Sequence, residues 1–272
     1  MSESSEKALV QYPTDRPLHL EETGIPRGIQ NAVLDCVGLS VKDLQNKKTL
    51  DVGVGGGWAL SQARKLGLNY YGVDLLPVKE SEYEIHDHQK RREQMKRALL
   101  RRAEANPSRV VAGDTEVALP FPADSFDVVL SSKASLLYAR KAELIKRAII
   151  EMIRVSRDLV ATSESFDDEG NFVIGPIKWG FDPSLQEQSF NLKDFLEDLK
   201  ECGISYKRGW DSPENTELIN QGLWNDPWTH WLHIDTSKKN NSKFYEKARE
   251  LLNDPNYPEI FLENKPTNET TP

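Results

Sequence analysis

A glycine-rich turn separates a predicted strand from a predicted helix and limits the folds open to this chain. Residues 49–60 read T-L-D-V-G-V-G-G-G-W-A-L, so four glycines fall within five positions directly after a short apolar run. Glycines at such a turn allow backbone N–H groups and the N-terminus of the following helix to approach a ligand closely. The stretch therefore predicts an α/β fold with a binding site at the end of its first strand.

The spacing of these glycines narrows the class of ligand. A dinucleotide fingerprint, G-x-G-x-x-G, needs a third glycine at the position where this chain has Trp58. A P-loop needs Gly-Lys-Ser or Gly-Lys-Thr, which does not follow here. The pattern that remains is D-x-G-x-G-x-G, in which Asp51 stands two places before Gly53.

Strand and helix patterns alternate along the rest of the chain. Short β-branched and apolar runs predict further strands at 69–74, 109–114, 126–132, 158–165, 203–210 and 229–235. Helical spacing of apolar residues or runs of helix formers predict helices at 29–44, 59–66, about 85–105, 143–155, 191–203 and 244–252. This alternation predicts a mostly parallel sheet with helices on both faces.

The domain organisation and compartment follow from composition. We expect an N-terminal cap at 1–45, a single domain at 46–262 with an inserted basic helix, and a disordered tail at 263–272 that has almost nothing to bury. The chain has two cysteines without a C-x-x-C pair, no signal-peptide pattern and no apolar run of membrane-spanning length, so we expect a cytoplasmic protein without a membrane partner. A net charge of −8 argues against a globally basic nucleic-acid binder.

Two later motifs complete the glycine pattern. Asp74 ends the second predicted strand about 20 residues beyond the glycines, where an acid can bind both ribose hydroxyls. Residues 111–132, V-A-G-D-T-E-V-A-L-P-F-P-A-D-S-F-D-V-V-L-S-S, follow with the third and fourth strands. Over about 49–165 the chain resembles the class I S-adenosylmethionine-dependent methyltransferases. The resemblance implies a Rossmann-like sheet of seven strands whose last strand is antiparallel, a helical N-terminal cap, and S-adenosyl-L-methionine as the cofactor.

The resemblance also implies roles for particular residues. Asp51 would organise the glycine loop and the methionine ammonium, and Asp74 would hold the ribose. Asp114 would accept a hydrogen bond from the adenine amino group, Thr115 would donate its backbone N–H to the ring, and Ser131 would turn a carbonyl toward the ammonium. The expected cofactor-binding set is Asp51, Gly53, Val54, Gly55, Gly57, Trp58, Asp74, Leu75, Gly113, Asp114, Thr115 and Ser131. We expect the ring of Trp58 to pack near the methionine moiety.

Methyl transfer from a sulfonium is an in-line displacement that depends mainly on aligning the acceptor atom, the methyl carbon and the sulfur. Such alignment can lower the activation barrier by about 7–11 kcal/mol. Lys133 follows the fourth predicted strand and is the candidate base, with a solvated lysine as the alternative reading. Ser131 and Ser132 stand where some relatives place a metal-binding aspartate, so we expect no metal site. Single histidines are more often surface or satisfied core residues than bases, and this applies to His19, His86, His88, His230 and His233.

Two features bear on the acceptor. The predicted helix over 90–102 carries a dense basic face, which is either solvated or a contact for RNA, a phosphate-bearing substrate or an acidic protein. Five of the six tryptophans lie between residues 179 and 231. The loop over 215–227 lies between the last two predicted strands, where the family resemblance implies a substrate lid, and aromatic rings there favour an apolar or aromatic acceptor.

No N-P-P-Y tetrad of amino-directed nucleic-acid methyltransferases is present. We therefore expect methyl transfer to an oxygen or nitrogen of a small molecule. The alternatives are a protein or RNA methyltransferase recruited through the basic helix, and a non-catalytic cofactor-binding partner subunit. The sequence leaves the oligomeric state open.

Overall fold

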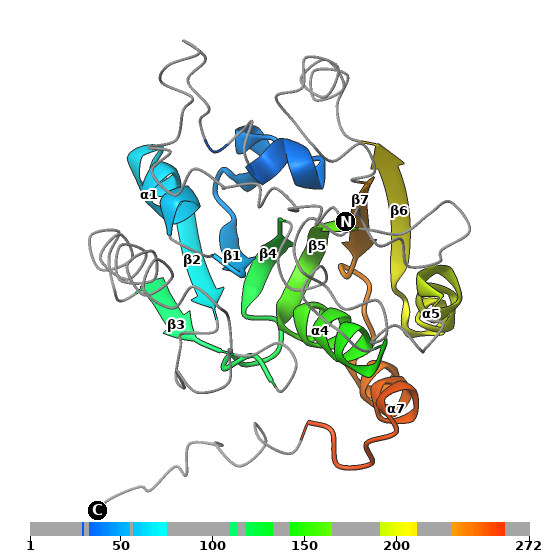
Figure 1. The fold of residues 1–272 in the computed structure, drawn as a ribbon. Helices are drawn as coiled ribbons and strands as arrows, with labels where there is room; N and C mark the ends of the chain where they lie inside the picture. The colour runs from blue at the N-terminus through cyan, green and yellow to red at the C-terminus, as the bar shows by residue number, and fades with distance from the viewer. Residues whose placement is uncertain are drawn as a thin grey trace, which may run out of the picture.

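A computed structural model of the chain shows an α/β protein built on one sheet (Figure 1). It describes residues 29, 33–54, 57–74, 109–113, 118–132, 142–164, 191–210 and 230–258. The predicted basic helix, the predicted lid and the predicted tail lie outside these residues.

The described strands and helices follow the predicted order. The strands are β1 (Lys48–Val52), β2 (Asn69–Asp74), β3 (Val110–Ala112), β4 (Phe126–Ser131), β5 (Ser156–Glu164), β6 (Ser205–Trp210) and β7 (His230–Asp235). The α-helices are α1 (Trp58–Lys65), α4 (Ala142–Val155), α5 (Leu192–Asp198) and α7 (Asn241–Leu252). Short 3-10 helices are η2 (Asp35–Val37), η3 (Val41–Leu44) and η6 (Lys200–Cys202).

The seven strands lie in the order β3-β2-β1-β4-β5-β7-β6. The pairs formed by β1 to β5 among themselves are parallel, whereas β7 runs antiparallel to both β5 and β6. The predicted seven-stranded sheet with an antiparallel last strand is therefore confirmed. The strand order changes direction between β1 and β4, and in open α/β sheets ligands bind outside the carboxyl ends of the strands at such a switch point.

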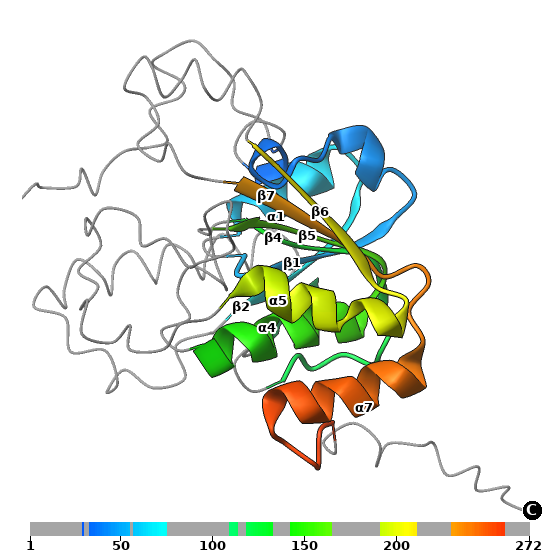
Figure 2. The same ribbon diagram turned by 90° about the vertical axis from the view of Figure 1, so that its right-hand side faces the viewer.

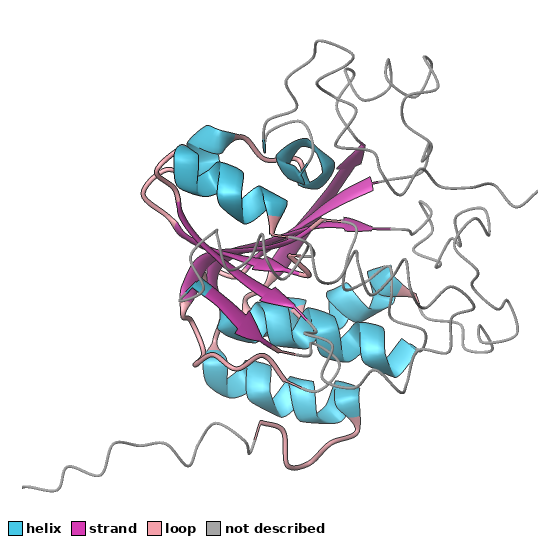
Figure 3. Cartoon of the chain, turned by 60° about the vertical axis from the view of Figure 1, so that its left-hand side comes forward, coloured by secondary structure: helices cyan, strands magenta, loops and turns pink. Residues whose placement is uncertain are grey.

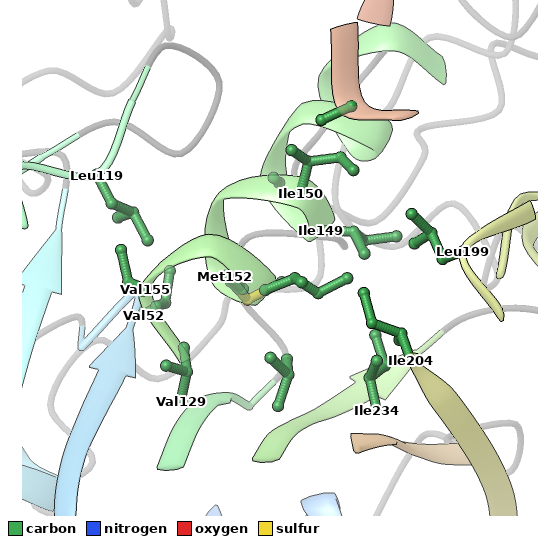
Figure 4. Packing of buried hydrophobic residues seen from close by; sticks show 14 of the residues in the cluster. Val52, Leu119, Val129, Ile149, Ile150, Met152, Val155, Leu199, Ile204 and Ile234 are labelled. Carbon is green, nitrogen blue, oxygen red and sulfur yellow. The ribbon is translucent and has the colours of Figure 1, made fainter. Parts of the chain in front are cut away.

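Helices cover both faces of the sheet, with α4, α5 and α7 on one side and α1 with the N-terminal elements on the other (Figures 2 and 3). Alternation along β1 divides its residues between the faces. Leu50 and Val52 join the apolar cluster around α4, while Tyr70 of β2 and Leu130 of β4 join the cluster under α1. Figure 4 shows the first cluster, in which Met152 of α4 packs among residues of several strands.

The predicted single helix over 29–44 is wrong in one respect. η2 ends at Val37, and Gly38 then adopts a left-handed conformation with φ +65°. Beyond this break Ser40 donates its backbone N–H and its hydroxyl to Asp43, at 2.7 and 2.8 Å, at the start of η3. The apolar periodicity was real, because Leu34, Val37 and Leu44 are all buried, but a glycine turn divides the segment.

Trp231 of β7 holds this N-terminal segment against the sheet. A Cβ atom on Gly38 would lie 2.8 Å from the indole, and one on Gly209, the cross-strand partner of Trp231, would lie 2.1 Å from it. His233, two residues further along β7, places its Nε2 2.7 Å from the carbonyl oxygen of Val37. Burial lowers the pKa of His233, which favours its neutral form. His233 is thus a satisfied core histidine, as expected.

A buried ion pair on α4 fixes the L-P-F segment that precedes β4. Glu151 and Arg154 are 0% and 1% exposed, and the Arg154 Nη2 lies 2.8 Å from the Glu151 Oε2. Glu151 accepts the backbone N–H of Leu119 at 2.6 Å, while Arg154 donates to the carbonyls of Leu119 and Phe121, each at 2.7 Å. The hydroxyl of Tyr257 also donates to Glu151, so the segment after α7 is bound to the same pair.

Candidate functional site

The glycine turn leaves β1 in a conformation that side chains disfavour. Gly53 has φ +79°, and Gly57, the N-cap of α1, has φ +74°. The backbone N–H groups of Gly53 and Val54 both donate to the carbonyl of Val73, at 2.8 and 3.2 Å, so the turn is tied to the end of β2. Both glycines therefore have a conformational reason to be glycine.

Val54 faces the interior instead of the turn's outer side. Its side chain is buried in the cluster under α1, where it lies over Gly72. A Cβ atom on Gly72 would come within 2.9 Å of both Val54 methyl groups. A ligand at this turn would thus meet mainly the main chain of Val54.

Asp51, at the start of the turn, is a buried acid with a strongly shifted pKa. It is only 4% exposed, and its Oδ2 accepts a hydrogen bond from the Tyr70 hydroxyl at 2.9 Å. Burial raises the pKa of Asp51 to about 7; the Tyr70 hydrogen bond opposes this rise, and the nearby charge of Asp74 adds to it. Burial and the neighbouring carboxylate raise the pKa of Tyr70 well above its ordinary value, so Tyr70 stays a donor.

Three further predicted residues lie at the carboxyl ends of neighbouring strands. Asp74 is the half-buried last residue of β2, and its carbonyl accepts the backbone N–H of Gly113 at 3.1 Å. A Cβ atom on Gly113 would lie 2.6 Å from Val73, so this close approach requires glycine. Ser131, the buried last residue of β4, has a carbonyl that accepts the Thr162 hydroxyl at 3.0 Å.

The parallel pairing of β1 with β2 and β4 therefore brings Asp51, Gly53, Asp74 and Ser131 to one edge of the sheet, at the switch point. The remaining predicted site residues lie outside the described residues, and their roles stay predictions. They are Gly55, Leu75, Asp114, Thr115, Lys133 and the side chain of Trp58.

Tyr70 is the site residue that the sequence analysis missed. A weak signal was present, because Tyr70 and Asp74 of the stretch N-Y-Y-G-V-D are four residues apart in a strand and so share a face. The contact with Asp51, however, depends on the register in which β1 pairs with β2.

The described ranges include no group of three or more His, Cys, Asp or Glu side chains that could hold a metal ion. Within the same ranges, no helix has the length and apolar character needed to cross a membrane.

A mostly parallel sheet with a switch point, a glycine turn after β1 and an acid at the end of β2 is typical of Rossmann-like cofactor-binding proteins. A family model for a methyltransferase domain matches residues 50–158, which contain this turn, both acids, most of β1, all of β2, β3 and β4, and the start of β5. Residues 50–158 thus match a methyltransferase domain, and this match supports S-adenosylmethionine as the cofactor.

Solved structures of similar fold are distant from this chain. An S-adenosylmethionine-dependent methyltransferase from Mesorhizobium loti is 18% identical with a TM-score of 0.44, over 70% of this chain and 90% of that one. A TehB-like methyltransferase from Corynebacterium glutamicum is 16% identical with a TM-score of 0.43, over 82% and 94% of the two chains. Magnesium protoporphyrin IX methyltransferase from Synechocystis with bound SAH is 15% identical with a TM-score of 0.42, over 70% and 74%.

A search of curated proteins found no match. Because the TM-scores lie below 0.5, the family assignment rests on the domain match and the sheet, and none of these structures identifies the acceptor of this chain.

Proposed function

We propose that the protein transfers a methyl group from S-adenosylmethionine to an oxygen or nitrogen of a small-molecule acceptor. The observation that carries this proposal is the juxtaposition of the Asp51 turn with Asp74 at the switch point. The turn offers a buried carboxylate without a cationic partner among the described residues, and Asp74 offers a second, half-buried carboxylate. These groups fit a ligand that has a cationic amino group and a ribose.

The residues of this chain would bind and orient the cofactor rather than activate the acceptor with a base. Asp51 would attract the cofactor's ammonium, Asp74 would accept hydrogen bonds from the ribose hydroxyls, and the turn would let the backbone approach closely. When bound, S-adenosylmethionine supplies a methyl group on a sulfonium, which is reactive toward a lone pair without a strong base. Alignment and exclusion of water are then the main tasks of the protein.

The neutral residues at the strand ends next to the proposed cofactor site support a small, uncharged acceptor. Ser131 and Ser132 at the end of β4, and Ser163 near the end of β5, are neutral, and the chain has a net charge of −8. Trp231, the cross-strand partner of Ser163, is a partly exposed aromatic residue near the same end of the sheet. The cysteines Cys36 and Cys202 are buried thiols that form no disulfide, which supports action in the cytoplasm.

Calorimetric titration of the full chain with S-adenosylmethionine tests the cofactor site. We expect micromolar binding, and Asp74→Ala should weaken it by about 10- to 100-fold, because a hydrogen bond to a charged group contributes about 1.5–3 kcal/mol. Asp235→Ala, at the last residue of β7 on the opposite edge, is the matched control and should bind as the parent does. Absence of binding at high micromolar cofactor contradicts the proposed function, and unchanged affinity of Asp74→Ala contradicts the ribose assignment.

The acceptor class needs a separate experiment. A cell extract, divided into small-molecule, RNA and protein fractions, is incubated with methyl-labelled cofactor and the protein, with Asp74→Ala as the background. We expect label in the small-molecule fraction, identified by mass spectrometry. Label in RNA or protein would favour recruitment through the predicted basic helix, and label in no fraction would favour a non-catalytic partner subunit.

A further inference from the structure

Asp51 and Tyr70 form a buried acid–hydroxyl pair across β1 and β2. Tyr70 is 1% exposed and is the register partner of Thr49, so its side chain lies on the same face of the sheet as that of Asp51. The direct register partner of Asp51 is Gly72, which has no side chain. The Tyr70 hydroxyl can therefore reach the carboxylate diagonally, at 2.9 Å.

Few charged groups surround this carboxylate. From β2 the titratable groups that act on it are Tyr70 and Asp74. The neighbouring β4 contributes the apolar Val128 and Leu130 to this face. Two elements that cover the face, η3 and α1, carry charged residues that are exposed and make no described contact with Asp51: Lys42 and Asp43 of η3, and Arg64 and Lys65 of α1. Among the described residues, Asp51 therefore depends on one neutral donor for its stabilisation.

We propose that Tyr70 is a positioning residue of the cofactor site, whose hydroxyl holds the Asp51 carboxylate in place and ionised so that it can receive the methionine ammonium of S-adenosylmethionine. This inference rests on the proposed function, because the contact between Asp51 and the ammonium belongs to it. A neutral hydroxyl suits this role better than a lysine or arginine would. It orients the carboxylate but leaves its negative charge to be neutralised by the ligand.

The arrangement links cofactor binding to a proton. In the free protein burial raises the pKa of Asp51 to about 7, so below that pH the carboxyl binds a proton that the ammonium must displace. Affinity should then rise about tenfold per pH unit up to about pH 7 and flatten above it. The raised pKa of Asp51 also makes the stability of the fold depend on pH, in the opposite direction to the cofactor affinity. Because the folded state holds the proton more tightly, the Asp51 contribution to stability falls as the pH rises from about 4 to about 7.

The test compares Tyr70→Phe with Tyr71→Phe by calorimetric titration with S-adenosylmethionine at pH 5.5–7.5. The cofactor's own amino group titrates near pH 8 and stays mostly cationic in this range. Tyr71→Phe removes the same hydroxyl from the adjacent residue, whose ring packs on Phe126 at 5.7 Å in the other cluster. We expect Tyr71→Phe to match the parent. Tyr70→Phe should bind about tenfold or more weakly at pH 7 and show an affinity that still rises at pH 7.5, because the pKa of Asp51 increases further.

Each outcome separates this inference from the proposed function. If the parent binds no cofactor, the proposed function fails. If the parent binds but the Tyr70→Phe profile superimposes on it, or is weaker by one constant factor at every pH, the positioning role is overturned. If Tyr70→Phe does not fold, Asp51→Asn decides, since its affinity should be weak and independent of pH over this range. A pH slope in Asp51→Asn equal to that of the parent would overturn the inference.

Discussion

Glycine residues that allow close contacts determine how the N-terminal segment packs against the sheet. Gly38 and Gly67 both have left-handed backbones, with φ +65° and +70°. They differ in what surrounds them: a Cβ atom on Gly67 would meet nothing within 4 Å, whereas one on Gly38 would lie 2.8 Å from Trp231. The indole has little room to withdraw, because it also lies against Gly209.

This contrast predicts that replacing glycine by alanine lowers the free energy of unfolding by different amounts at the two positions. Gly67→Ala should lower the free energy of unfolding by about 1–2 kcal/mol, the cost of a left-handed conformation in an L-residue. Gly38→Ala should cost about 1–3 kcal/mol more, because it also overpacks the Trp231 contact. Urea unfolding of the two variants and the parent measures this difference. Equal costs would show that the indole moves away freely.

Two acids of the proposed cofactor site show how far the positions of single residues can be predicted from sequence. Asp51 and Asp74 were predicted from motif spacing, and the structure brings them to one edge of the sheet. Tyr70 was not predicted, because nothing in N-Y-Y-G-V-D says that one tyrosine lies under the turn and the other packs on Phe126. That choice follows from which face of the sheet each residue occupies.

At the scale of elements, α4 shows what a buried ion pair does in this fold. Its Glu151 and Arg154 bind main-chain groups of the L-P-F segment and the hydroxyl of Tyr257. A single element thus holds both the approach to β4 and the segment after α7. Breaking such a pair leaves a buried charge without its partner, which is strongly unfavourable.

Arg154→Met should therefore lower the free energy of unfolding by about 3–5 kcal/mol. Arg157→Gln is the matched control, since Arg157 also pairs with a carboxylate at 2.8 Å, that of Asp127, but is 59% exposed. It should cost at most about 1 kcal/mol. Denaturant unfolding of both variants checks the prediction. A small loss for Arg154→Met would mean that Glu151 is satisfied by its other donors.

Elements were largely predictable from sequence because their signals are local. The seven strands and the helices α1, α4, α5 and α7 occur where periodicity and turn residues placed them, with ends shifted by a few residues. The segment over 29–44 was predicted as one helix because its apolar spacing is helical. The structure divides it at Gly38, where the contact with Trp231 requires a glycine.

The whole molecule is organised around the switch point between β1 and β4. The described part of the predicted cap, residues 29 and 33–45, contributes Leu34, Val37 and Leu44 to the same apolar cluster as Val54 of the glycine turn. The N-terminal segment is therefore packed on the domain's own core and lies on the α1 face of the sheet (Figure 2). The turn that is proposed to hold the cofactor and the segment that covers this face share one set of contacts.

By itself the sequence determined the order of the strands and helices, the glycine turn with Asp51, the acid Asp74 at the end of β2, and the resemblance to methyltransferases. These depend on neighbouring residues and on motif spacing. Only the tertiary structure decided the pairs that join distant positions. Tyr70 meets Asp51 across 19 residues, Tyr257 meets Glu151 across 106, and His233 meets Val37 across 196. Strand register and helix packing create these contacts, and a local pattern in a single sequence specifies neither.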